Sequence, residues 1–179
     1  MAETKQSLRR MMMARLRALT PEQADALSAE VMSCLERQLT FQAAHTVLLY
    51  HSLPTEVCTH NFIERWSGAK LLLLPVVVGS ELELRCYTGP GSMVAGRYGI
   101  LEPVGPAFTD WASIDLVAVP GVAFDSHGGR LGRGKGYYDR LLPRLPRARK
   151  LGICFPFQLV ESVPTDPHDV LMDAVITTT

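Results

Sequence analysis

The stretch Asp115–Leu142, DLVAVPGVAFDSHGGRLGRGKGYYDRLL, shows best which kind of fold this chain adopts. It opens with a short, mainly apolar run over Asp115–Val119, which has the length of a buried strand. Five glycines then fall within nine positions, and the pattern becomes helical over Gly136–Leu142. A strand that leads through a glycine-rich turn into a helix is typical of α/β folds.

The same alternation of strands and helices extends through the chain from residue 46 onward. Six short apolar or alternating runs predict strands: Thr46–Tyr50, Ala69–Leu74, Leu82–Tyr87, Asp115–Val119, Lys150–Cys154 and Ala174–Thr177. A helical pattern covers Val57–Trp66, and Leu82–Arg85 alternates as an edge or antiparallel strand would. We therefore predict a single domain over residues 1–179, an α/β three-layer sandwich with a mainly parallel central sheet.

The N-terminal part of the chain predicts two helices. Lys5–Leu19 is basic and amphipathic, and Thr20-Pro21-Glu22-Gln23 is the start signal of a second helix, with Thr20 as N-cap and Gln23 completing a capping box. Further on, Thr88–Phe108 is longer than most connections and rich in glycine and proline. We expect it to be a long loop, and such loops are often functional.

The composition is ordinary for a globular protein, with 47% hydrophobic and 20% charged residues and a formal net charge of zero. Charge alone therefore points to neither nucleic acid nor membrane. The N-terminus lacks the apolar core of a signal peptide, and the longest apolar run, Leu71–Val78, is too short to span a bilayer. We expect a cytoplasmic protein. Between Arg130 and Lys150, however, eight basic residues accompany the single acid Asp139, which favours a polyanionic ligand.

The glycine-rich loop has the chemistry of a phosphate site. Glycines let backbone N–H groups approach an anion, and Arg130, Arg133 and Lys135 supply charge and donors for phosphate oxygens. The loop is not a P-loop, because Gly136 stands where that motif has Ser or Thr, and the spacing of a dinucleotide turn fails as well. A bound magnesium ion would therefore need a carboxylate, for which Asp139 is the candidate.

The string Pro120-Gly121-x-Ala123-Phe124-Asp125, followed by Gly129-Arg130-Leu131-Gly132-Arg133-Gly134-Lys135-Gly136-Tyr137-Tyr138-Asp139, resembles the signature of the 5-formyltetrahydrofolate cyclo-ligase family. Three further segments resemble that family: Lys5-x-x-Leu8-Arg9, Glu56 after the first strand, and Tyr98-Gly99-Ile100-Leu101-Glu102-Pro103. The resemblance implies a monomer with a fold similar to the sugar-phosphate isomerase and CoA-transferase sandwiches. It also implies a reaction in which ATP and Mg²⁺ convert 5-formyltetrahydrofolate to 5,10-methenyltetrahydrofolate, ADP and phosphate.

The resemblance also implies roles for individual residues. The ATP-binding residues would be Lys5, Arg9, Arg130, Leu131, Gly132, Arg133, Gly134, Lys135, Gly136, Tyr137 and Tyr138. The folate-binding residues would be His51, Glu56, Tyr98, Arg133, Gly134, Lys135, Gly136 and Tyr137. Asp139 and Asp169 would hold the metal, and Arg130, Arg133 and Lys135 would neutralise charge during phosphoryl transfer. We expect one of the two adjacent tyrosines to stack on the pterin and the other to pack under the loop.

Two positions depart from the family pattern, and two other functions are conceivable. His51 stands where the family has an aliphatic residue, and Val76 follows Pro75 where a basic residue is frequent. His51 could also relay protons near neutral pH. The alternatives are a sugar-phosphate isomerase, which would use no ATP, and an RNA-binding module, for which only Tyr137 and Tyr138 offer aromatic faces near the basic loop.

Overall fold

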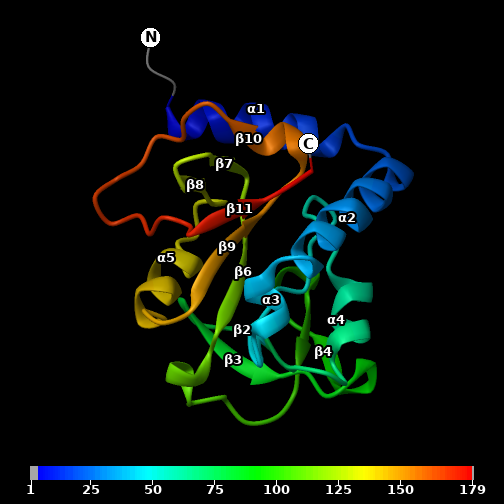
Figure 1. Ribbon diagram of the computed structural model, residues 1–179. Helices are drawn as coiled ribbons and strands as arrows, with labels where there is room; N and C mark the ends of the chain where they lie inside the picture. Colours follow the sequence, from blue (N-terminus) through cyan, green and yellow to red (C-terminus); the bar gives the residue numbers. More distant parts are fainter. Residues whose placement is uncertain (1–3, 179) are drawn as a thin grey trace.

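The structure is a computed structural model, and it describes residues 4–178. Its centre is a six-stranded sheet with the strand order β11-β9-β6-β1-β2-β3 (Figure 1). The strands are β1 (Thr46–Leu48), β2 (Leu71–Val78), β3 (Glu81–Cys86), β6 (Leu116–Pro120), β9 (Arg149–Ile153) and β11 (Ala174–Ile176). Neighbouring strands are parallel except for β3, which runs antiparallel to β2 at one edge. The predicted sheet and its antiparallel edge strand are confirmed.

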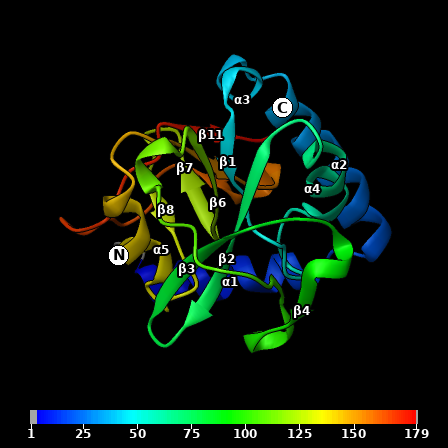
Figure 2. The ribbon, with the colours of Figure 1, turned by 90° about the horizontal axis from the view of Figure 1, so that it is seen from below.

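Both faces of this sheet are buried, as a parallel sheet requires. Along β1, β2 and β6, alternate residues enter two separate hydrophobic cores; Val47 belongs to one and Leu48 to the other. The helices α1 (Lys5–Arg17), α2 (Pro21–Glu36) and α4 (His60–Trp66) pack in the first core, and α5 (Tyr137–Leu141) packs in the second. Figure 2 shows α2 and α4 on one side of the sheet and α5 on the other. The chain is therefore the three-layer α/β sandwich predicted.

The start of α2 agrees with the sequence pattern, whereas the start of α4 does not. The Thr20 side chain accepts from the Gln23 N–H and the Gln23 side chain from the Thr20 N–H, which forms the predicted capping box. The helix predicted from Val57 begins only at His60. Thr59 is the reason, because its backbone N–H donates to the Ser52 side chain and its hydroxyl donates to the Tyr50 carbonyl, which holds the preceding segment against β1. A short helix, α3 (Leu39–Ala43), was not predicted.

The long connection Thr88–Phe108 is not the irregular loop expected from its sequence. It folds into an antiparallel hairpin of β4 (Met93–Ala95) and β5 (Leu101–Pro103), preceded by a single 3₁₀ turn, η1 (Pro90–Ser92), and with another, η2 (Arg97–Gly99), at its tip. Short strands of this kind leave too few alternating residues to be read from the sequence. We call this element the β4–β5 hairpin.

The glycine-rich segment also contains short strands that its composition did not predict. Arg130–Leu131 forms β8, which pairs with β7 (Ala123–Asp125), and β7 pairs in turn with β10 (Leu159–Val160). The remainder of the segment, residues 132–136, leads into α5, and we call it the glycine loop. α5 begins at Tyr137, one residue later than predicted, and Pro143 converts its last turn into the 3₁₀ helix η4 (Leu142–Arg144).

Two further short elements complete the chain, the 3₁₀ helices η3 (Trp111–Ser113) and η5 (Pro156–Gln158). Within residues 4–178, no helix is long and apolar enough to cross a membrane.

Candidate functional site

A pocket with a volume of about 490 Å³ lies beyond the carboxyl ends of β1 and β6. In doubly wound α/β sheets this edge is where ligands generally bind. All sixteen residues that the sequence implicates line this one pocket: Lys5, Arg9, His51, Glu56, Tyr98, Arg130, Leu131, Gly132, Arg133, Gly134, Lys135, Gly136, Tyr137, Tyr138, Asp139 and Asp169. They come from α1, the segment after β1, the β4–β5 hairpin, the glycine loop, α5 and the chain before β11.

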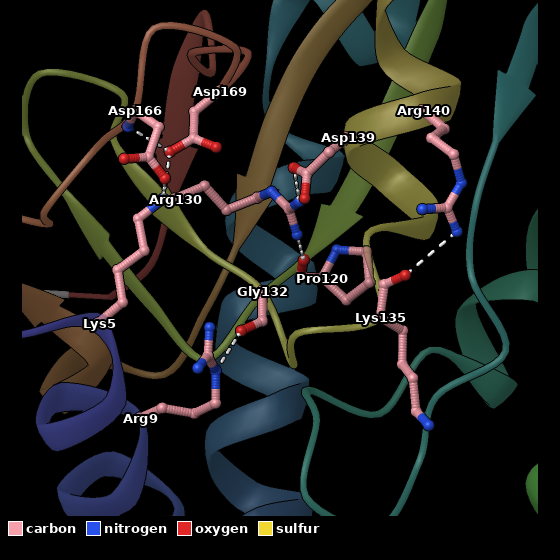
Figure 3. A network of polar contacts seen from close by, with 10 residues as sticks. All are labelled: Lys5, Arg9, Pro120, Arg130, Gly132, Lys135, Asp139, Arg140, Asp166 and Asp169. Atoms are coloured by element: carbon pink, nitrogen blue, oxygen red, sulfur yellow. Dashed lines mark hydrogen bonds and ion pairs between the residues drawn. The ribbon is translucent and has the colours of Figure 1, made fainter.

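Arg130 lies at the floor of the pocket and is already engaged. Its side chain is only 6% exposed, and the guanidinium donates to the Pro120 carbonyl (3.0 Å) and to Asp139 Oδ1 (2.8 Å; Figure 3). Strand β8 supplies this position, since its pairing with β7 sets the direction of the side chain. Arg130 therefore fixes Asp139 beside the end of β6, in addition to any charge that it presents to a ligand.

Helix α1 brings two cations to the same wall. Lys5 Nζ donates to Asp166 Oδ2 (2.7 Å) and Asp169 Oδ2 (2.6 Å), and the Asp166 backbone N–H also donates to Asp169 Oδ2. Burial raises the pKa of Asp169, but the bonds from Lys5 and Asp166 outweigh it, so the net pKa is lowered. Arg9 Nε donates to the Gly132 carbonyl (2.9 Å), which ties the glycine loop to α1 (Figure 3).

Lys135 is the cation of the loop that remains available. Its ammonium makes no hydrogen bond or ion pair with any of residues 4–178, and it lies 5.6 Å from the ring centroid of Tyr98. The Tyr98 hydroxyl is 3.4 Å from the Tyr137 hydroxyl, so the β4–β5 hairpin and α5 meet over the pocket. Tyr98 has a φ of 61°, the left-handed region that is unfavourable for a bulky side chain. Strain of this kind is often retained at functional sites.

The pocket lining also contains a buried carboxylate. The Glu56 side chain is 10% exposed, and it accepts from the Leu53 N–H (2.8 Å) and from Arg133 Nε (3.2 Å). Burial raises the pKa of Glu56, and the bonds from Leu53 and Arg133 counteract this only in part. Arg133 also donates to Thr55 Oγ1 (2.7 Å). Arg133 thus links the glycine loop to the segment after β1.

His51 and the two tyrosines of α5 take distinct positions. His51 stacks on His60 with ring centroids 3.9 Å apart, and burial together with the charge of His60 lowers its pKa to about 4. The imidazole is therefore neutral at pH 7, and this lowered pKa disfavours a proton-relay role near neutral pH. Tyr137 faces Tyr98, whereas Tyr138 lies beside Arg130, whose guanidinium carbon is 5.7 Å from its ring centroid.

Sequence reasoning missed most of the apolar lining and one acid. The additional lining residues are Tyr50, Leu53, Pro75, Val77, Leu82, Ile100, Glu102, Pro120 and Gly121. Glu102 is 8% exposed, and its Oε1 accepts from the Val77 N–H (3.0 Å), so it fastens the β4–β5 hairpin to β2. Gly96 leaves the room for it, because a methyl group at Gly96 would overlap the Glu102 carboxylate. A signal existed, since Glu102 lies in the segment that resembles the family.

Asp125, another residue of the quoted signature, supports the loop and does not line the pocket. Its carboxylate is 4% exposed and accepts from the backbone N–H groups of His127 (2.9 Å), Gly129 (2.8 Å) and Val163 (2.8 Å). Burial raises the pKa of Asp125, but these three donors outweigh it and lower the pKa overall. The turn between β7 and β8 is therefore built around one carboxylate.

Asp139 and Asp169 offer a magnesium ion two carboxylate ligands. Residues 4–178 contain no group of three or more His, Cys, Asp or Glu side chains placed to hold a metal ion. Mg²⁺ does not need one, because it commonly binds through one or two carboxylates together with substrate phosphates and water. Asp139 and Asp169 each use one oxygen in described hydrogen bonds and leave the other free. The pair therefore suits a magnesium ion that a bound phosphate helps to hold.

Comparisons with known proteins agree with one another. Residues 1–178 match the model of the 5-formyltetrahydrofolate cyclo-ligase family. A 5-formyltetrahydrofolate cyclo-ligase of Escherichia coli is 33% identical over 172 residues, which cover 91% of this chain and 94% of the relative. A mitochondrial relative from Arabidopsis thaliana is 47% identical over 75 residues, 36% of this chain and 27% of the relative. The solved structure of Aquifex aeolicus 5,10-methenyltetrahydrofolate synthetase is 37% identical, with a TM-score of 0.87 over 97% of this chain and 89% of that one.

Proposed function

The chain belongs to the 5-formyltetrahydrofolate cyclo-ligase family, and we propose that both of its substrates meet in the pocket lined by the glycine loop. As a member, it is an ATP-dependent ligase that converts 5-formyltetrahydrofolate to 5,10-methenyltetrahydrofolate. Family membership decides against the isomerase and the RNA-binding module. One observation supports the assignment of the site: the Lys135 ammonium, which has no polar partner among residues 4–178, lines the same pocket as Glu56 and the α1 cations Lys5 and Arg9.

On the nucleotide side, the glycine loop and α1 would bind the phosphates of ATP. Lys135 offers an ammonium without a described polar partner, and Lys5 and Arg9 of helix α1 line the same pocket. Backbone N–H groups of Gly132–Gly136 can approach phosphate oxygens closely, because most of these positions carry no side chain. Arg130 and Arg133 keep this loop in place through Asp139 and Glu56 while adding positive charge.

On the folate side, Glu56 would accept hydrogen bonds from the amino and ring N–H groups of the pterin. A carboxylate can accept several bonds through its two oxygens, so its bonds from Leu53 and Arg133 do not exhaust it. His51 is neutral and stacked on His60, which gives it a flat face that can replace the aliphatic contact of the family. Tyr137, which meets Tyr98 over the pocket, is the tyrosine that we assign to stacking.

The chemistry then needs positioning and charge neutralisation more than it needs a protein nucleophile. The formyl oxygen attacks the γ-phosphorus of ATP, the bond to the β–γ bridging oxygen breaks, and ADP leaves. The N10 nitrogen then attacks the activated formyl carbon, loses its proton, and phosphate departs with the former formyl oxygen. Holding N10 against that carbon turns ring closure into an intramolecular step. Lys135 and Arg133 of the glycine loop, together with Arg130 of β8, would stabilise the charge on the transferred phosphoryl group.

Asp139 and Asp169 would hold Mg²⁺ at the phosphates of ATP through their free carboxylate oxygens. When bound, the ion would screen the negative charge of these phosphates. Arg130 orients the Asp139 carboxylate and Lys5 orients the Asp169 carboxylate through their ion pairs.

We further propose that residues 1–179 form one domain that acts as a monomer in the cytoplasm. The central sheet supports the first part, since it contains strands from Thr46 through Ile176 and is covered by helices from Lys5 onward.

The test is an assay of methenyl product by its near-ultraviolet absorbance, with 5-formyltetrahydrofolate, Mg²⁺ and ATP. Lys135→Ala should lower kcat at least about 100-fold, because electrostatic stabilisation of a transition state by one group is typically worth that much. Arg10→Ala, which removes an exposed cation of α1 outside the set of described lining residues, serves as control and should leave kcat unchanged. Near-normal turnover of a folded Lys135→Ala protein would show that the phosphates bind elsewhere.

A further inference from the structure

Arg140 lies behind the glycine loop, outside the set of described residues that line the pocket. It belongs to α5, one turn after Gly136, and its side chain is 39% exposed. Ion pairs of exposed arginines usually contribute little to the stability of the fold. This one differs, because its guanidinium is held by backbone groups from two separate parts of the chain.

The first of these parts is the turn between β2 and β3. Both Nε and Nη2 of Arg140 donate to the Ser80 carbonyl, with Nε at 2.9 Å, and Nε lies 3.4 Å from Glu81 Oε1. Ser80 joins two strands whose cross-strand partners Val77 and Leu82 both line the pocket. Arg140 is thus attached to the tip of the hairpin that forms one wall.

The second part is the glycine loop itself. Arg140 Nη2 also donates to the Lys135 carbonyl (3.1 Å), as Figure 3 shows. The Lys135 backbone is therefore held from behind, while its ammonium has no polar partner among residues 4–178 and lies on the pocket side. A single guanidinium therefore connects the β2–β3 turn to the backbone of Lys135.

The local sequence makes this contact possible. Gly136 has a φ of 73°, and a Cβ at this position would come within 2.6 Å of Arg140 Nη1. A side chain here would therefore both strain the backbone and displace the guanidinium. The guanidinium also lies over the ring of Tyr137, 5.4 Å from its centroid, which favours one orientation of the planar group.

We propose that Arg140 is a positioning residue that sets the distance between the glycine loop and the β2–β3 hairpin, and so the place of the Lys135 ammonium in the pocket. This inference rests on the proposed role of Lys135. Hydrogen bonds to two carbonyls in different parts of the chain, those of Ser80 and Lys135, can fix a separation, which a single surface ion pair with Glu81 cannot do. Misplacement of a charged group by about 1 Å can cost about 100-fold in rate, so even a modest loosening is measurable.

The experiment compares Arg140→Met with Arg147→Met in the product assay. Arg147 is an exposed arginine a few residues further on, without a described polar contact, so its variant controls for the loss of charge. Arg140→Met should lower kcat about tenfold, equivalent to about 1.4 kcal/mol, with KM for ATP changed less than about twofold because Lys5 and Arg9 remain in place. The kcat of Arg140→Lys, whose single ammonium group lacks the planar fork of arginine, should fall between those of Arg140→Met and Arg147→Met.

Hydrogen exchange separates positioning from general stability. In Arg140→Met, amides of residues 78–81 and 132–137 should exchange faster, and amides of β6 and β9 should not. Unchanged kcat in Arg140→Met would overturn the proposal, and so would a lower kcat without faster exchange in both segments. If Arg140→Met does not fold, Arg140→Lys decides by the same two measurements. Wild-type activity and Lys135→Ala, measured in parallel, show separately whether the proposed site itself is right.

Discussion

Replacing Asp125 by Asn should destabilise the fold strongly, because one buried carboxylate organises the turn that precedes β8. Asp125 Oδ1 accepts from two backbone N–H groups and Oδ2 from a third, that of Val163. In Asp125→Asn the amide oxygen can keep the two bonds from the turn, but the amide NH₂ then meets the Val163 N–H, donor against donor. A buried donor without an acceptor costs about 1–3 kcal/mol, and the remaining two bonds lose their charge assistance.

Together these losses amount to about 2–4 kcal/mol, a large share of the roughly 5–15 kcal/mol that stabilises a typical domain. Urea unfolding at pH 7, followed by tryptophan fluorescence, measures the difference. Asp110→Asn is the matched control, since Asp110 is an exposed aspartate whose side chain has no described hydrogen bond. A difference below about 0.5 kcal/mol between Asp125→Asn and the wild type, the range of ordinary surface changes, would refute the reasoning.

The difference in unfolding free energy between the wild type and Asp125→Asn should also depend on pH, in a direction set by the pKa of Asp125. Because the folded pKa of Asp125 lies below its ordinary value, the carboxylate stabilises the fold fully above the unfolded pKa, near 4. This stabilisation is lost as the pH falls through the folded pKa. The gap between the wild type and Asp125→Asn should therefore be constant from pH 7 to pH 5 and should narrow only below about pH 4. A gap that closes between pH 7 and pH 5 would point to another group.

Two further predictions concern the ligands. Glu56→Gln should raise KM for 5-formyltetrahydrofolate about tenfold, because it weakens a charge-assisted hydrogen bond worth about 1.4 kcal/mol. KM for ATP should change less than about twofold. Initial rates with each substrate varied in turn measure both constants, and an equal rise in both would contradict the assignment. Asp139→Asn should raise the Mg²⁺ concentration for half-maximal rate about tenfold, because a carboxylate ligand loses its charge. A magnesium titration checks this against Asp110→Asn, and an unchanged midpoint would exclude Asp139 as a ligand.

Much of the site could be predicted from the sequence because its residues gather in a few short segments. The glycine loop and its flanks carry ten of the sixteen implicated pocket residues, from Arg130 to Asp139. Glycine spacing and clustered cations are local properties, and a family signature is a local string. The other six, among them Lys5, Glu56 and Asp169, were accessible only through resemblance, since nothing near them in the chain indicates a shared pocket.

The sequence by itself predicted the six strands of the central sheet and the capping box at Thr20, and it indicated phosphate chemistry for the glycine loop, because each of these depends on residues a few positions apart. Only the tertiary structure decided which charges are engaged. Lys5 meets Asp169 across 164 positions, Arg133 meets Glu56 across 77, and Arg140 reaches Ser80 across 60. Such contacts depend on how the sheet brings strand ends together, which no local periodicity encodes. For the same reason Arg130 proved to be a buried partner of Asp139, and Lys135 the cation left available to a ligand.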